Sequence, residues 1–115
     1  MNNSPIGVYD SGFGGLSVWR EIHRRLPEES LLYLGDGKNC PYGGRSREEI
    51  SAFAREAVER LIGEGVKMVV VGCNTATTAA VDALRAEWPD IPIVGLEPAV
   101  KPACLSSRTR RIAVL

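Results

Sequence analysis

The sequence has few of the residues that build disulfide frameworks, metal centres or membrane spans. It contains three cysteines, Cys40, Cys73 and Cys104, widely spaced and odd in number, and a single histidine, His23. Neither a disulfide scaffold nor a structural zinc site is predicted, because no Cys-x-x-Cys pair or Cys/His cluster occurs. A reducing compartment fits this cysteine usage better than an oxidising one. The longest aliphatic run, residues 68–71, is far too short to span a bilayer.

An excess of charge of one sign is also missing. The 14 basic and 14 acidic side chains give a formal net charge of +0, so no basic excess indicates nucleic-acid binding. The first ten residues lack the basic head and apolar centre of a signal peptide. We therefore expect a cytoplasmic protein that binds neither nucleic acid nor membranes. Its 115 residues, 44% of them hydrophobic, suffice for one folded domain.

Short β-branched runs alternate with helical patterns along the chain. Strands are expected at residues 6–9, 31–34, 68–71 and 91–94. Apolar residues at helical spacing predict helices over residues 16–26, 46–62 and 75–86. The second helix begins with a capping box, Ser46 to Glu49, and glycines end it. This alternation predicts an α/β fold with a doubly wound, mostly parallel sheet.

Ligands of open α/β sheets bind beyond the carboxyl ends of the strands. Polar or reactive residues follow three expected strands, in residues 10–15, 40–44 and 72–75. We expect the first and third of these segments to converge on one crevice, with the second lying over it. All of the candidate site residues lie in these segments.

Cys73 is the strongest single candidate. It follows a buried strand and precedes a helix, so its sulfur would face the helix N-terminus, where N–H groups and the helix dipole stabilise a thiolate. Asn74 and Thr75 could cap that helix or hold a carboxylate. On position alone, a small buried cysteine beside an ordinary N-cap explains the pattern equally well.

The glycine-rich segment after the first strand lacks the Lys-Ser/Thr of a P-loop. It could be a tight turn capped by Asp10 or Ser11, or Asp10 could be the proton partner of the cysteine. Tyr42, between a proline and a glycine, could lie in an ordinary surface turn. His23 is expected at the surface, and the other two cysteines are expected to be structural.

Five segments together resemble the glutamate racemases of the aspartate/glutamate racemase family. They occur in the family's order and with similar spacing, at residues 6–18, 33–36, 41–43, 73–75 and 92–95. The resemblance implies two similar α/β domains with the active site between them, and no cofactor. Residues 1–97 would form the first domain with one catalytic cysteine, and residues 98–115 the linker and first strand of the second.

The resemblance also implies a mechanism. Two cysteines act on opposite faces of glutamate, one thiolate removing the α-proton and the other thiol donating one. Cys73 matches one of these cysteines and Asp10 the acid that assists it, while the implied substrate contacts are Asp10, Ser11, Tyr42, Gly43, Asn74 and Thr75. The Gly-Cys-Thr-His block that carries the opposing cysteine does not occur in the sequence. We therefore expect the N-terminal portion of a longer enzyme, holding half of the site.

By the same resemblance, the complete enzyme would be a homodimer that supplies D-glutamate for peptidoglycan. Two other interpretations remain open at this point. One is a non-catalytic α/β module that keeps the carboxylate-binding loops, and the other is an aspartate racemase. A reading frame that continues into a second Cys-Thr-His block would argue against the first, and an assay of glutamate against aspartate would address the second.

Overall fold

The computed structural model describes residues 3–96, 105–109 and 111–112. Strands and helices alternate along the chain in the order β1 (Ile6–Asp10), α1 (Leu16–Arg25), β2 (Leu31–Gly35), α2 (Arg47–Gly63), β3 (Met68–Val71), α3 (Asn74–Glu87) and β4 (Ile93–Gly95). The strands form one sheet in the order β2-β1-β3-β4, and each neighbouring pair is parallel. The predicted α/β fold is confirmed.

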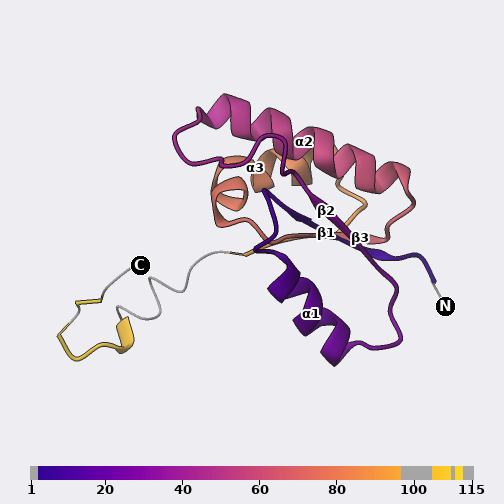
Figure 1. The fold of residues 1–115 in the computed structure, drawn as a ribbon, viewed down its shortest axis with the longest axis horizontal. Helices are drawn as coiled ribbons and strands as arrows, with labels where there is room; N and C mark the ends of the chain where they lie inside the picture. The colour runs from indigo at the N-terminus through magenta and orange to yellow at the C-terminus, as the bar shows by residue number, and fades with distance from the viewer. Residues whose placement is uncertain (1–2, 97–104, 110, 113–115) are drawn as a thin grey trace.

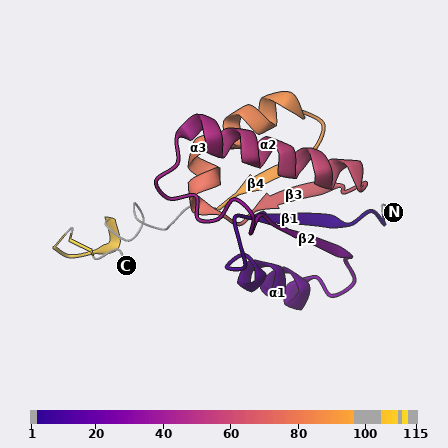
Figure 2. The same ribbon diagram turned by 45° about the horizontal axis from the view of Figure 1, so that its top comes forward.

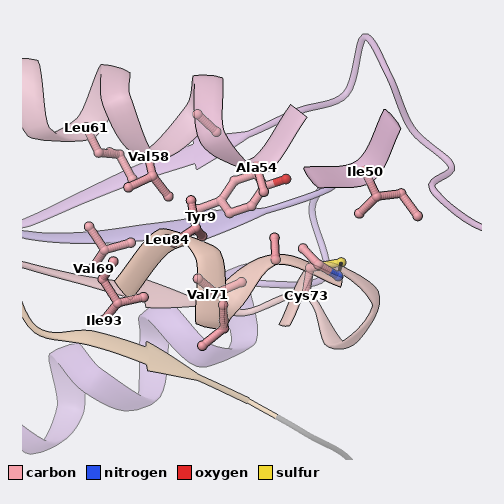
Figure 3. Close-up of a cluster of buried hydrophobic side chains, with 14 of the residues drawn as sticks. Tyr9, Ile50, Ala54, Val58, Leu61, Val69, Val71, Cys73, Leu84 and Ile93 are labelled. Atoms are coloured by element: carbon pink, nitrogen blue, oxygen red, sulfur yellow. Dashed lines mark hydrogen bonds between the residues drawn. The ribbon is translucent and has the colours of Figure 1, made fainter. Parts of the chain in front are cut away.

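Helices cover both faces of the sheet. Helix α1 lies on one face, and α2 and α3 lie side by side on the other (Figures 1 and 2). The β3 run is apolar throughout because successive side chains alternate between the faces. Val69 and Val71 belong to the larger core under α2 and α3, whereas Val70 belongs to the smaller core under α1. Figure 3 shows the larger core, where strand side chains meet Val58 and Leu61 of α2.

The boundaries of α2 follow the signals in the sequence. Ser46 is the N-cap, and its hydroxyl accepts a hydrogen bond from the Glu49 N–H at 3.1 Å. Gly65, with φ of 85°, follows the helix and turns the chain toward β3. Strand β4 begins at Ile93, after Pro92, two residues later than expected. A proline has no N–H group to donate to a strand ladder, which accounts for the later start.

The linker and strand expected in residues 98–115 lie largely outside the described residues, and Cys104 lies wholly outside them. In the described part of the chain, no helix is long and apolar enough to cross a membrane. Strands β1 and β3 lie at the centre of the sheet, and their carboxyl ends position the candidate site.

A candidate active site at the carboxyl ends of strands β1 and β3

Cys73 and Asp10 leave the sheet at the same edge, from adjacent strands. The register pairs Tyr9 of β1 with Val71 of β3, and the Gly72 N–H donates to the Tyr9 carbonyl at 2.7 Å. Asp10 is the next residue after Tyr9 and the last of β1, and Cys73 lies two residues after Val71, beyond the end of β3. This arrangement confirms the prediction that the first and third polar segments converge.

Cys73 is the N-cap of α3. Its backbone is extended (φ −95°, ψ 120°), and its Sγ accepts a hydrogen bond from the Ala76 N–H at 3.4 Å. The sequence had offered Asn74 and Thr75 as caps. That assignment is wrong, because they are the first two residues of the helix itself. The Cys73 side chain is only 7% exposed and lies at the positive end of the helix dipole, where negative charge is favoured.

Several backbone N–H groups at this edge of the sheet could bind a ligand. Among the described residues, no hydrogen bond is formed by the backbone N–H groups of Ser11, Tyr42, Gly43, Asn74 and Thr75. The first N–H groups of a helix point beyond its end and have no partner within it. Such donors at a helix N-terminus bind carboxylates and other anions. These five residues are also among the substrate contacts predicted from the sequence.

Asp10 shapes the glycine turn between β1 and α1. Its buried carboxylate accepts hydrogen bonds at Oδ2 from the N–H groups of Gly12, at 3.3 Å, and Gly15, at 2.9 Å. The turn is tight: a Cβ atom on Gly15 would lie 2.6 Å from the Asp10 Cβ. Asp10 thus has the structural role that the sequence offered as one alternative. No hydrogen bond joins it to Cys73 in the described part of the chain.

Tyr42 does not lie in a surface turn, and that interpretation is wrong. Its side chain is 3% exposed, and its ring packs on Phe53 with the centroids 5.5 Å apart. Its hydroxyl donates to Asp36 Oδ2 at 2.6 Å and lies 2.5 Å from the Tyr9 hydroxyl. Burial, followed by the hydrogen bonds to Asp36 and Tyr9, raises the pKa of Tyr42. The Tyr42 loop therefore lies against Tyr9 of β1, and its position over the crevice stays a prediction.

Thr77, to which no sequence pattern assigned a role, holds Cys73 in place. The Thr77 hydroxyl donates to the Cys73 carbonyl at 2.9 Å and accepts from the Leu96 N–H at 3.2 Å. It therefore joins the first turn of α3 to the end of β4. The signal that could have found it is one polar residue on the buried face of α3, among Ala76, Ala80 and Val81.

His23 lies away from this edge of the sheet, whereas the Cys40 sulfur lies beside Gly12 of the glycine turn. His23 is exposed near the C-terminal end of α1 and stacks on Trp19, with the ring centroids 5.4 Å apart. This confirms its expected surface position. Cys40 was expected to be structural, but it is exposed and free, because the buried residue of its loop is Tyr42. No group of three or more potential metal ligands occurs among the described residues.

Known proteins match both the sequence and the fold. The family model for Asp/Glu/Hydantoin racemase matches residues 6–115. A glutamate racemase of Clostridium novyi is 50% identical over 115 residues, covering 100% of this chain and 44% of its own. The structure of a Thermus thermophilus glutamate racemase in complex with β-chloro-D-alanine superposes with a TM-score of 0.80 at 44% identity, covering 88% of this chain and 40% of that one.

A second solved structure extends the likeness. The Escherichia coli glutamate racemase, in complex with L-glutamate and the activator UDP-MurNAc-Ala, has a TM-score of 0.82 and 37% identity. It covers 92% of this chain and 40% of its own. The chain thus spans less than half the length of the relatives it matches. The resemblance to glutamate racemases that the sequence motifs indicated is confirmed.

Proposed function

We propose, on the premise that this chain belongs to the Asp/Glu/Hydantoin racemase family, that the whole protein interconverts L- and D-glutamate without a cofactor. The observation that carries the proposal is the position of Cys73. A buried sulfur at the N-terminus of α3 lies among N–H groups that have no partner among the described residues. A proton acceptor beside unpaired donors suits the removal of a proton next to a carboxylate.

The chemistry requires charge stabilisation. The Cys73 thiolate takes the α-proton, and the electron pair of the broken C–H bond delocalises into the substrate carboxylate. With no electron sink such as pyridoxal phosphate, the N–H groups of Asn74 and Thr75 at the start of α3 must hold this charge, in a site that excludes water. A second thiol then donates a proton to the opposite face of the carbanion. This sequence supplies one of the two groups, and the other belongs to the rest of the protein.

Asp10 and Ser11 complete the proposed half-site. Asp10 assists proton transfer at Cys73, and its hydrogen bonds to the glycine turn fix its side chain. Ser11 presents a free N–H at the end of β1 and contacts the substrate, as do the Tyr42–Gly43 backbone, Asn74 and Thr75. Binding through several fixed backbone donors suits a small dicarboxylic amino acid.

The proposed biological role follows from the reaction. D-glutamate made in the cytoplasm would supply peptidoglycan synthesis, with the whole protein acting as a homodimer. Aspartate is the second candidate substrate, because the matching family includes racemases of both acids. An assay with the two amino acids side by side decides between them.

The test uses a chimaera in which this chain replaces the matching 44% of the Clostridium novyi relative. Circular dichroism follows the loss of optical activity of D-glutamate. We expect the chimaera to racemise glutamate and Cys73→Ser to abolish turnover, because a serine hydroxyl is far too weakly acidic to serve as the base. Cys40→Ser removes an exposed thiol and is the matched control, with activity retained. Racemisation by a folded Cys73→Ser variant would refute the proposal.

A further inference from the structure

Three side chains from separate segments form a chain of hydrogen bonds beside the candidate site. Tyr9 lies on β1, Asp36 follows β2, and Tyr42 lies in the loop that precedes α2. The Tyr9 and Tyr42 hydroxyls are 2.5 Å apart, and Tyr42 donates to Asp36 Oδ2 at 2.6 Å. Asn39 donates from Nδ2 to both Asp36 carboxylate oxygens at 3.0 Å.

The donors and acceptors in this chain of hydrogen bonds follow one order, from Tyr9 through Tyr42 to Asp36. Each tyrosine hydroxyl carries one proton, and an ionised carboxylate can only accept. Because Tyr42 gives its proton to Asp36, the hydrogen bond between the tyrosines must be donated by Tyr9. Tyr42 is therefore the central member, with one bond on each side, and Tyr9 is the terminal donor. Removing the Tyr42 hydroxyl breaks two bonds, whereas removing the Tyr9 hydroxyl breaks one.

The chain connects the Tyr42 loop to the strand that carries the site. Tyr9 is fully buried and directly precedes Asp10 at the end of β1. On the other side, the Asp36 N–H donates to the Asp10 carbonyl at 2.9 Å. The two end members of this chain of hydrogen bonds, Tyr9 and Asp36, are thus both fixed to β1. Gly43 follows the central tyrosine directly, is exposed, and has an N–H group without a partner in the part of the chain that the structure describes.

We infer that Tyr9, Tyr42 and Asp36 are positioning residues that hold the Tyr42–Gly43 backbone where it binds the substrate carboxylate. The inference rests on the proposed function for the identity of the substrate. The Tyr42 side chain itself faces the core and is engaged on both sides, so it does not contact the substrate. Its hydroxyl fixes the backbone N–H groups that do.

The first test uses this polypeptide by itself, without the chimaera. It measures the rate of amide hydrogen exchange in the Tyr42 loop. The Arg45 N–H donates to the Tyr42 carbonyl at 3.1 Å and reports on the turn that includes Gly43. We expect Tyr42→Phe to accelerate exchange of this amide about tenfold or more relative to the amides of α3. Tyr9→Phe should have a smaller effect, and the double variant should match Tyr42→Phe, because the central substitution already breaks the bond to Tyr9.

The control separates positioning from general loss of stability. Val66→Ala truncates a buried side chain that precedes β3, at the opposite edge of the sheet. It should accelerate exchange at Arg45 no more than it does in α3. The inference would be overturned if the exchange rate of the Arg45 amide, taken relative to the amides of α3, were the same in Tyr42→Phe and in Val66→Ala. Additive effects of the two tyrosine substitutions would also overturn it, because they would contradict the direction of the chain.

The second test measures kinetics in the chimaera. We expect Tyr42→Phe to raise KM for glutamate about tenfold while kcat changes less than about threefold, because backbone donors bind substrate and transition state alike. Asp36→Asn keeps one acceptor oxygen and should fall between Tyr42→Phe and the unmodified chimaera. An unchanged KM would overturn the inference. If the unmodified chimaera does not racemise glutamate, the proposed function fails, and the exchange pattern still decides whether the chain holds the loop.

Discussion

Replacing Thr77 with valine tests whether one hydroxyl holds the cysteine end of α3. Valine has nearly the shape of threonine, so Thr77→Val opens no cavity. It removes the hydrogen bonds of the hydroxyl to the Cys73 carbonyl at 2.9 Å and the Val71 carbonyl at 3.5 Å, and the bond from the Leu96 N–H at 3.2 Å. Each of these three partners keeps another bond. The Cys73 carbonyl still accepts from the N–H of residue 77 at 2.9 Å, and the Leu96 N–H still donates to the Val71 carbonyl at 3.2 Å. The cost should therefore be about 1–2 kcal/mol of the free energy of unfolding, less than for groups left without any partner.

Thr78 provides a matched control one residue further along α3. Its hydroxyl also donates to a backbone carbonyl, that of Asn74 at 3.2 Å, but the side chain is exposed. Thr78→Val has the same helix propensity change and should alter the free energy of unfolding by less than about 0.5 kcal/mol. The assay is equilibrium urea denaturation of both variants, followed by far-ultraviolet circular dichroism. Equal losses in the two variants would refute the role assigned to Thr77, as would an unchanged midpoint in Thr77→Val.

Three further predictions concern the glycine turn, the half-buried Tyr33 and the isolated chain. Gly15→Ala places a Cβ 2.6 Å from the Asp10 Cβ and should cost about 1–3 kcal/mol in thermal or urea unfolding. Gly63→Ala meets no atom within 4 Å and should not destabilise, and an unaffected Gly15→Ala would contradict the tight turn. Burial raises the pKa of Tyr33 to about 12 from 10.0, so as pH rises through this range the unfolded state loses its proton first and the free energy of unfolding falls. Tyr33→Phe should flatten that decline in urea titrations at pH 9 to 11, and an identical slope would argue against it. The 115-residue chain alone should not racemise D-glutamate above a no-enzyme control, because the proposed mechanism needs a second cysteine from the rest of the protein.

Local signals in the sequence determined the elements and the position of the site. Short β-branched runs predicted the strands, apolar residues at helical spacing predicted the helices, and the capping box predicted the start of α2, because these signals depend on neighbours within a few residues. The chain order of strand, cysteine and helix placed Cys73 at a carboxyl edge for the same reason. Since the carboxyl ends of parallel strands meet at one edge, the convergence of Asp10 and Cys73 also followed from the sequence.

The tertiary structure alone decided how each side chain is used. Tyr42 is buried and Cys40 exposed because the loop docks through contacts to Tyr9, 33 residues away in sequence. The hydroxyl of Thr77 finds Leu96 only after β4 has joined the sheet. Contacts of this kind depend on how segments distant in the sequence pack together, and local hydropathy patterns do not predict that packing. The sequence could name the residues at this edge, and only the packed chain shows which of them face the core and which offer free donors.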